Sequence, residues 1–437
     1  MNERHSLKAA VPLPSLLRKI ARLGKRLWVR IGLIAGLALL SVALSGIVSP
    51  VLPDEVPDVL GAGALHDILE IIASSMLAVT IFSLSVMVSV HRAVSGQWSP
   101  RARMLLLTDR TTMTTLATFL GAWLFALTGV ILMDTPYIGE REVFALFLIT
   151  LAVITYVVFS IMRWIVHLED LGSLEQTADR VEEAVRSALS QRLGAPCLGG
   201  HALTPEVTIP WDAAVVEATR SGWVRHIYED ALNEVGRRHA VDIYLTVPIG
   251  RFVYRGDEIA RVTDHAPEAE AEIVQQVEIG NSRSFEQDPR FGFVVLGEVA
   301  SKALSPGIND SGTAIDAATR AGRLLLAWRS EAVDDAPRYE RIWAMPLRAV
   351  DLLEDAYRAP GRDGAGQVEV VVTIIKALGR LTLHEDRSMA RAARDMARQV
   401  ASRAERTLED PSDLGDVADA LSKALARREA AHLSALE

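Results

Sequence analysis

Four long apolar runs without a charged side chain dominate the first third of the chain. They are Ile31–Ser49, Ile71–Val90, Thr111–Met133 and Val143–Met162. Each is close to the roughly 20 helical residues that cross a bilayer core of about 30 Å. No comparable run follows Met162. The pattern therefore predicts four transmembrane helices within residues 31–162.

The short segments that flank these runs alternate in charge. Residues 1–30 carry eight basic side chains, and His91–Arg110 carries four arginines. Pro50–Glu70 has no basic residue, and Asp134–Glu142 has only Arg141. Basic loops stay on the inner side of a membrane. We therefore expect both termini, and everything after the last run, to face the cytoplasm.

The second apolar run is rich in hydroxyl groups. At about 100° per residue, Ser74, Ser75, Ser85 and Ser89 share one side of the predicted helix with Ala78. This side has two interpretations. It packs against another helix, with each serine bonded to the preceding turn, or it lines a pore or solute path. The runs contain no ionisable residue, which argues against a proton-coupled pump.

The second basic loop contains Gln97-Trp98-Ser99-Pro100-Arg101. Tryptophan is common at membrane interfaces, and arginine pairs with lipid phosphates. We interpret Trp98 and Arg101 as interface anchors, with a gating role near the inner mouth of a pore as the alternative.

The pattern after Met162 is that of a large soluble domain made mainly of helices. The predicted fold is thus an α-helical membrane protein with four transmembrane helices, plus a mainly α cytoplasmic domain that contains a small β subdomain. The predicted divisions are a basic arm (1–30), the transmembrane domain (31–162), a membrane-proximal helix and linker (163–204), the β subdomain (205–264) and a helical domain (265–437).

A helix is predicted over His167–Leu193, directly after the last span. Its apolar residues Leu174, Ala178, Val181, Val185 and Ala188 are spaced four and three apart, as in a coiled-coil seam. Such a seam joins protomers or packs on its own domain, and the sequence alone leaves both open.

Residues 241–262 have the alternation and turn glycines of β-structure. Val241–Val247 alternates as a strand does, and Gly250–Val262 places apolar positions around two glycines. The latter segment predicts a tight hairpin, either generic or half of a barrel-sandwich fold similar to biotinyl and lipoyl domains. No lysine lies at its tip. We therefore expect neither biotin nor lipoate.

The rest of the chain has helical periodicity broken by Pro and Gly clusters. The predicted helices are Ala266–Ile279, Asp288–Ala303, Thr313–Arg329, Pro346–Tyr357, Val368–Leu383, Asp386–Leu408 and Ser412–Ala430. Asp288 followed by Pro289 is a typical helix start. The polar loop Leu304–Thr313 is a tight connector, or else its Asn309 and Asp310 bind an ion, a headgroup or another protomer at the next helix.

Composition and charge narrow the class of protein. Half of the residues are apolar and 23% are charged, which fits a chain with a membrane part and a soluble part. The chain has 46 basic and 55 acidic residues, and residues 1–162 hold 13 and 10 of them, so the remainder holds 33 and 45. This acidic remainder argues against nucleic acid as a partner. Membrane lipids are the expected partner of the basic arm.

Chemical motifs are scarce. The chain has one cysteine, Cys197, and no phosphate-binding loop, dinucleotide fingerprint, zinc-protease motif or serine-hydrolase elbow. The histidines lack zinc-ligand spacing. His384-Glu385-Asp386 opens a helix, which favours a cap over a catalytic group. The sequence therefore predicts no enzyme, no metal and no cofactor.

Several segments resemble a known family. Gln287–Gly292, Glu298–Ala300 and Ala303–Asp310 look like the signature of a bacterial membrane protein family known as domain of unknown function 2254. Phe82–Ser85, Gln97–Arg101 and the Gly250–Val262 segment are similar to it too. The resemblance extends from the first span to about Arg323. It implies a bacterial inner-membrane protein and implies no particular activity.

Two functions remain open. In the first, the chain is an oligomeric channel or transport-like protein for an ion or small solute, with the second span along the path and the cytoplasmic domain gating it. In the second, the spans only tether a regulatory or scaffolding domain. The serine-bearing side favours the first, and we expect a homo-oligomer.

Overall fold

The computed structural model describes residues 29, 31–37, 39–40, 62–97, 101, 110–134, 140–170, 174–264, 266–329 and 337–434. The chain divides into two compact units. The apolar unit comprises Met1–Val94 and Leu106–Ser173, and the C-terminal unit comprises Ser95–Leu105 and Leu174–Glu437. Each unit has a hydrophobic core of its own.

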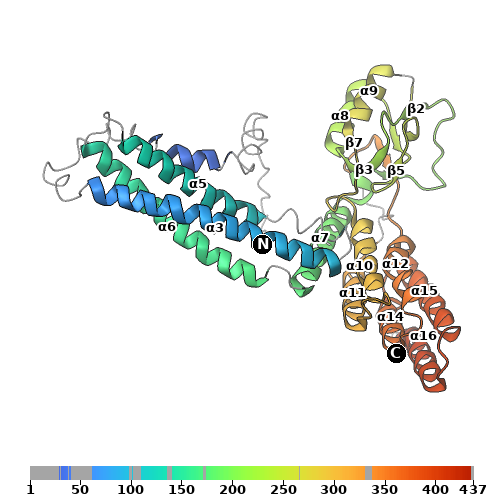
Figure 1. Cartoon of the computed structure of the whole chain (residues 1–437). Coiled ribbons are helices and arrows are strands. Elements are labelled where there is room, and N and C mark those ends of the chain that lie inside the picture. The colour runs from blue at the N-terminus through green and yellow to red at the C-terminus, as the bar shows by residue number, and fades with distance from the viewer. Residues whose placement is uncertain are drawn as a thin grey trace, which may run out of the picture. The chain divides into compact units, whose positions relative to one another are not determined.

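Three described helices of the apolar unit are long and apolar enough to cross a membrane (Figure 1). They are α3 (Ala62–Gln97), α5 (Arg110–Met133) and α6 (Glu140–Asp170). They coincide with three of the four predicted runs. Of the predicted span Ile31–Ser49, the structure describes helical residues 31–37 and 39–40, and the rest lies outside the described residues. A transmembrane helix over Ile31–Ser49 therefore stays a prediction.

Two of these helices are longer than the apolar runs that predicted them. α3 begins at Ala62, so Asp67 and Glu70 are helical and do not belong to a loop. α6 continues past Met162 to Asp170. Charge ends an apolar run but does not end a helix, because glutamate and arginine are good helix formers. The apolar runs therefore predicted only the part of each helix that suits the hydrocarbon core of a bilayer.

The core of the apolar unit lies between α3, α5 and α6. One side of α3 buries Leu65, Leu69 and Met76 against Phe125 of α5 and Leu146 of α6. The three α3 residues recur at four and seven positions, which places them on one side of a helix. This choice of buried side leaves the opposite side of α3 to face outward.

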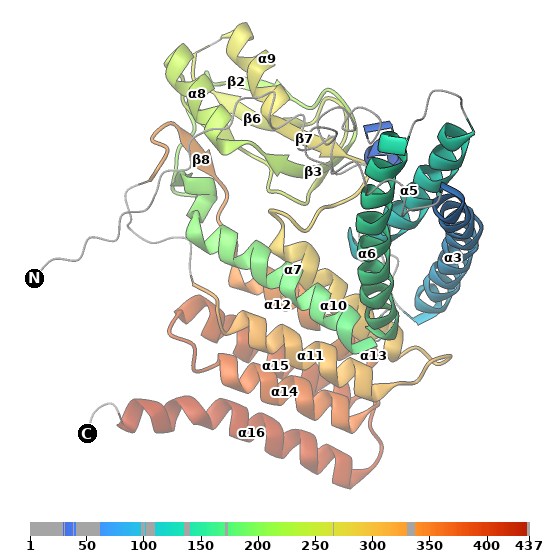
Figure 2. The same ribbon diagram turned by 90° about the vertical axis from the view of Figure 1, so that its left-hand side faces the viewer.

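The C-terminal unit is mainly helical, as predicted. Its helices are α7 (Leu174–Gly194), α8 (Glu229–His239), α9 (Pro267–Gln276), α10 (Pro289–Ala303), α11 (Ser311–Leu325), α12 (Ala349–Tyr357), α13 (Pro360–Asp363), α14 (Val368–Leu381), α15 (Arg387–Glu405) and α16 (Pro411–Ser434), with the short 3₁₀ turn η3 (Pro196–Gly199). α10 contacts α7, α11 and α12, and α14 contacts α11, α15 and α16 (Figure 2). The Asp386 side chain caps the start of α15, as the sequence predicted from its position at the start of a helix.

The seam predicted on the membrane-proximal helix packs within its own chain. The predicted helix His167–Leu193 is divided between α6 and α7, with residues 171–173 outside the described part. Val181 and Val185 are fully buried, and α7 contacts α10 and α11. Arg320 of α11 donates to Glu182 of α7 over 3.0 Å. Packing on its own domain, one of the two open interpretations, is the one observed.

Within the described residues, eight short strands form two small sheets, with α8 and α9 beside them (Figure 1). The strands are β1 (His201–Ala202), β2 (Ala214–Glu217), β3 (Gly222–Ile227), β4 (Ile243–Leu245), β5 (Phe252–Val253), β6 (Glu258–Val262), β7 (Val277–Gly280) and β8 (Ile342–Ala344). One sheet has the order β1-β8-β4-β6-β2 and the other β5-β3-β7. β1, β7 and β8 lie outside the predicted range 205–264, so the sheets gather strands from a longer stretch of chain.

The predicted hairpin over Gly250–Val262 is wrong. The chain does turn after Tyr254, at Gly256 with a left-handed φ of 90°, but β5 pairs with β3 while β6 pairs with β2 and β4. Both β2–β3 and β5–β6 therefore pass from one sheet to the other. Gly256 N–H donates to Ala218 O over 2.9 Å, which joins the two connections. Glycine spacing marks a turn but does not state which strands pair.

One predicted helix end is a strand. The predicted helix Ala266–Ile279 ends at Gln276, and Val277–Gly280 forms β7 beside β3. Val277 and Ile279 are buried across from Ile227 and Val224. These β-branched residues find their partners about 50 positions earlier in the chain, a pairing that local periodicity does not contain.

Candidate functional site: the outward face of helix α3

The outward side of α3 carries an unbroken seam of exposed residues. We define the α3 seam as the positions spaced four and three residues apart that are all exposed: Asp67, Ile71, Ser74, Ala78, Ile81, Ser85, Val88 and Arg92. Residues at this spacing follow one line along a helix. The seam contains Ser74 and Ser85 from the predicted set. Ser89 is exposed beside it, and Ser75 is only partly exposed.

α3 is the least covered of the three spanning helices. In its most apolar stretch 11% of the residues are buried, compared with 44% for α5 and 33% for α6. The seam mixes small and larger side chains: the small Ser74 and Ala78 are followed by Ile81 and then by Ser85. Small residues let helix backbones approach, and the larger ones fill the gaps between turns. The face has the form of a helix-packing surface.

The serine hydroxyls bond to their own helix. Ser74 Oγ donates to Ile71 O over 3.1 Å, and Ser75 Oγ donates to the same carbonyl over 2.6 Å. Ser85 Oγ donates to Ile81 O over 2.9 Å. Each hydroxyl hydrogen is thereby used, while the oxygen lone pairs stay available to an outside donor or ion. The seam is therefore mildly polar without an unsatisfied donor at these three serines.

Charges lie only at the ends of the seam. Asp67 and Arg92 are separated by 25 positions, or roughly 37 Å of helix at 1.5 Å per residue. Between them the seam carries serines, alanine and aliphatic residues. The spacing fits a helix that holds one charged residue at each surface of a bilayer.

The second predicted site, the loop with Asn309 and Asp310, forms a helix cap. Thr313 N–H donates to Asp310 Oδ1 over 3.0 Å, and the Thr313 hydroxyl donates to Oδ2 over 2.5 Å. These bonds hold the pKa of Asp310 below its usual value, with the Thr313 hydroxyl as the largest cause. Asn309 has a left-handed φ of 49° and accepts from Gln367 Nε2 over 3.2 Å. The connector interpretation accounts for both residues.

Asp288, the third candidate residue for a site in the C-terminal unit, is 2% exposed and is surrounded by the residues that it contacts. Arg283 Nε donates to its Oδ2 over 2.8 Å, and Phe291 N–H donates to its Oδ1 over 3.1 Å. Burial raises the pKa of Asp288, and Arg283 opposes the rise. Gly250 lies against it so closely that an added Cβ would stand 2.1 Å from Oδ2. Asp288 therefore joins the β-sheet region to the start of α10.

Its neighbour Gln287 completes this junction. Ile227 N–H donates to Gln287 Oε1 over 3.0 Å, and Gln287 Nε2 donates back to Ile227 O over 3.2 Å. The end of β3 is thus paired with a side chain as it would be with another strand. The signature segment Gln287–Gly292 consequently carries structural contacts between β3 and α10.

The predicted interface anchors are described in part. Trp98 lies outside the described residues. Arg101 belongs to the C-terminal unit and forms an ion pair with Glu298 of α10. The Glu298 carboxylate competes with lipid phosphates for this arginine, and the proposed contact of Arg101 with lipid stays a prediction.

Elsewhere in the described ranges, charged side chains meet as ion pairs, as Arg290 does with Asp351 and Asp355. Within these ranges, no cluster of three or more His, Cys, Asp or Glu side chains is arranged to hold a metal ion. His384 Nδ1 accepts from Asp386 N–H over 3.0 Å, and Asp386 accepts from Ser388 and Met389 N–H. The His384-Glu385-Asp386 segment therefore opens α15 as a cap, which was the favoured interpretation.

Sequence reasoning missed an exposed aromatic row on the three-stranded sheet. Phe252 and Tyr254 are 38% and 66% exposed, and their ring centroids lie 5.1 Å apart. Trp223 packs edge-on against Phe252 at 5.3 Å. The signal was present as aromatic residues at alternate positions 252 and 254, but the pairing with Trp223 depends on the register of β3 with β5.

Relatives of the chain are known by sequence. An uncharacterized protein of Mycobacterium bovis is 22% identical over 430 residues, which cover 84% of this chain and 78% of the relative. Two uncharacterized proteins of Mycobacterium tuberculosis match with the same identity and coverage. No solved structure matches the chain.

A family model matches far more of the chain than the signature segments alone. The match covers residues 24–380, from before the first apolar run to the end of α14. The expected end of the resemblance near Arg323 is therefore wrong, since α12 and α14 are included. Three apolar helices of spanning length agree with the description of that family. The chain belongs to the family described as Predicted membrane protein (DUF2254).

Proposed function

We propose that the protein is a subunit of an inner-membrane oligomer in which α3 seams meet and border a path for an ion or small solute. The observation that carries the proposal is the α3 seam, exposed along its whole length on the least covered spanning helix. In this proposal the C-terminal unit lies in the cytoplasm and regulates the path.

Helix packing supports the oligomer. A seam with spacing of four and three residues suits the left-handed crossing of about +20° that is common in membrane bundles. Ser74 and Ala78 allow a neighbouring helix to approach closely. A symmetric assembly would use the same face on every copy, since subunits of one chain share their orientation in the membrane.

The polarity of the seam supports a path beside this interface. The lone pairs of Ser74 and Ser85 offer weak, neutral contacts to a passing solute. Symmetry would collect Asp67 at one mouth and Arg92 at the other. Rings of like charge repel within a tight contact, and water in an open mouth relieves that repulsion.

The orientation is part of the proposal. Basic flanks place the N-terminus and the chain after α6 on the cytoplasmic side. Two reporter enzymes, one active only in the cytoplasm and one active only in the periplasm, can each be fused after Asp170, where α6 ends. Only the cytoplasmic reporter should be active there. Activity of a periplasm-specific reporter at this position would overturn the orientation.

Cysteine crosslinking tests the oligomer. The natural chain carries only Cys197, which is buried, so it should give no crosslink by itself. Ser74→Cys and Ser85→Cys should each yield a disulfide-linked dimer under mild oxidation in native membranes. Ser83→Cys is the matched control, because Ser83 is a buried serine of the same helix. Dimers from Ser83→Cys alone would contradict the proposed interface.

Flux measurements test the path separately. Liposomes containing the full chain should pass potassium or glycerol faster than empty liposomes, and Ser85→Leu should slow that flux severalfold. Ile81→Leu is the matched control on the same seam, since it leaves polarity and size nearly unchanged. Crosslinked oligomers without flux of either probe would reject the path while keeping the interface.

A membrane-tethered binding protein is the second candidate. The exposed Phe252 and Tyr254, which pack beside the half-buried Trp223, favour it, because contiguous aromatic residues at a surface are typical of interaction surfaces. A double variant Phe252→Ala and Tyr254→Ala should then abolish the cellular phenotype of the chain while Ser85→Leu leaves it intact. The reverse result would favour the path.

A further inference from the structure

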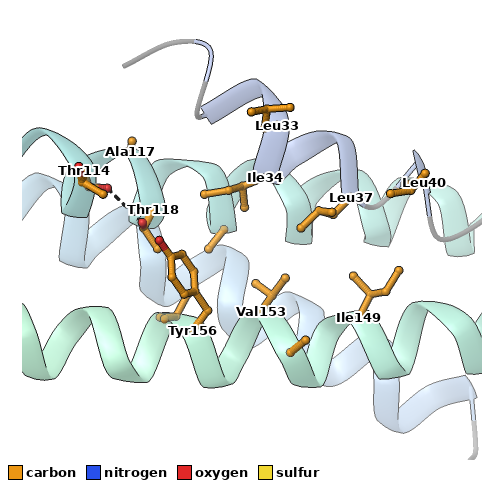
Figure 3. Close-up of a pocket in the computed structure, with 13 residues that line it drawn as sticks. Leu33, Ile34, Leu37, Leu40, Thr114, Ala117, Thr118, Ile149, Val153 and Tyr156 are labelled. Carbon is orange, nitrogen blue, oxygen red and sulfur yellow. Dashed lines mark hydrogen bonds between the residues drawn. The ribbon is translucent and has the colours of Figure 1, made fainter. Parts of the chain in front are cut away.

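The apolar unit contains a cavity that includes no residue of α3. Its volume is about 750 Å³, within the range of small-molecule sites. It lies between the first helical segment, α5 and α6 (Figure 3). Its lining includes Ile34 and Leu37 of the first helix, Thr118 of α5, and Ala152, Val153 and Tyr156 of α6.

Most of this lining is aliphatic. Figure 3 shows Ile34 and Leu37 pointing from the first helix toward Val153 of α6. Gly121 lets the first helix approach α5, because an added Cβ there would stand 2.8 Å from Ile34 Cβ. An aliphatic cavity does not hold water stably, since water needs two to four polar partners. Within a bilayer, a hydrocarbon group is the natural filling.

One polar side chain departs from this pattern. Tyr156 is the fourteenth residue of the spanning stretch Val143–Leu168, which is 26 residues long, so it stands at the midpoint. Tyrosine normally sits at the membrane surface, where its hydroxyl meets water. With this stretch centred in a bilayer core of about 30 Å, the hydroxyl would lie roughly 15 Å from either surface, which is farther than the side chain reaches.

The Tyr156 hydroxyl makes no hydrogen bond to any described residue. At the same end of the cavity, Thr118 Oγ1 donates to Thr114 O over 3.0 Å, which leaves its lone pairs unused (Figure 3). An unpaired hydroxyl in hydrocarbon is costly. Tyr156 therefore has a donor without an acceptor beside an apolar cavity, and this points to a ligand that supplies the acceptor.

We propose that the cavity binds an uncharged lipid of the bilayer interior that carries a carbonyl or hydroxyl oxygen. Tyr156, which is 48% exposed, donates to that oxygen, and the aliphatic residues contact one side of the hydrocarbon. No charged residue lines the cavity, so a carboxylate or phosphate would lose its hydration without compensation. Phospholipid headgroups stay at the membrane surface, whereas an isoprenoid alcohol or quinone reaches the depth of Tyr156.

Photolabelling of the full chain in lipid nanodiscs tests this site. The probe is farnesol with a diazirine group, and labelled peptides are mapped by mass spectrometry. Labels should fall in the first helix, α5 and α6, and decylubiquinone should compete while oleate does not. Tyr156→Phe, which removes only the hydroxyl, should weaken labelling at a limiting probe concentration roughly tenfold, as expected for one hydrogen bond in an apolar medium.

Two further variants make the result decisive. Ala152→Trp fills the cavity from an exposed position of α6 and should abolish labelling without disturbing the core. Thr155→Val is the control, because Thr155 donates to Leu151 O and does not line the cavity, so labelling should persist. Labelling unchanged by Tyr156→Phe, or competition by oleate equal to that by decylubiquinone, would overturn the proposal. Ser85→Leu should leave labelling unchanged, which separates this site from the proposed path.

Discussion

Two aspartates begin consecutive helices of the C-terminal unit, and the contrast between them separates local from tertiary structure. Asp288 caps α10 and Asp310 caps α11, each by accepting from the backbone N–H three residues later. In the sequence both are polar residues that open an apolar-periodic helix. In the fold, Asp288 is sealed against Arg283 and Gly250, while Asp310 sits in a loop of exposed residues.

The contrast shows that the cap itself is a modest part of what such a residue contributes. Burial raises the pKa of Asp288, whereas the bonds from Thr313 lower the pKa of Asp310. The same carboxylate with the same local role thus experiences opposite environments. Arg283 and Gly250, which lie in loops next to the strands, pack on the first cap, whereas the second cap bonds to Thr313 of its own helix.

The largest effect is expected from Asp288→Ala. The change removes a helix cap and leaves Arg283, whose side chain is 16% exposed, without its partner. Breaking a buried ion pair in this way costs about 3–5 kcal/mol. Denaturant unfolding of the full chain in detergent, followed by circular dichroism, measures the loss. A cost near 1 kcal/mol, as for an ordinary cap, would erase the distinction between the two aspartates.

Gly250→Ala should have the next largest effect. Gly250 has a left-handed φ of 84°, and an added Cβ would stand 2.1 Å from Asp288 Oδ2. The strain and the displaced carboxylate together should cost about 3 kcal/mol. Gly256→Ala is the matched control, since Gly256 has a φ of 90° with nothing within 4 Å of an added Cβ. Equal losses for the two variants would show that Asp288 does not press on Gly250.

Asp310→Ala should cost about 1 kcal/mol, and Asp310→Asn only a few tenths, because asparagine caps a helix about as well as aspartate. Thermal unfolding of both variants in detergent provides the measurement. The cellular phenotype of Asp310→Asn tests whether the same loop binds a ligand. A lost phenotype in Asp310→Asn, with stability and oligomer size unchanged, would return the loop to the status of a binding site.

The smallest effect concerns pH. A lowered pKa means that folded Asp310 releases its proton more readily than the unfolded chain does. Its contribution to stability is therefore present above the ordinary pKa of about 3.9 and is lost as pH falls through the folded pKa. The natural chain should lose slightly more stability than Asp310→Asn on acidification from pH 5 toward pH 3. Identical pH profiles for the two proteins would contradict the lowered pKa.

Local chemistry in the sequence determined much of this protein. Apolar runs located α3, α5 and α6, since a bilayer-length helix needs only neighbours along its own chain. The caps at Asp288, Asp310 and Asp386 were predictable for the same reason, because a cap joins residues two or three positions apart. The hydroxyl-bearing side of α3 was also evident from helical periodicity.

Tertiary structure decided which of these features meet. Strands β5 and β6 follow one another yet belong to different sheets, and β7 pairs with a strand about 50 residues earlier. The apolar cavity beside Tyr156 depends on three helices at once. Local propensity acts over a few residues, whereas pairing and burial depend on segments far apart in sequence. The sequence thus specified the helices and their caps, and only the packed chain decided which strands pair and which side chains are left without a partner.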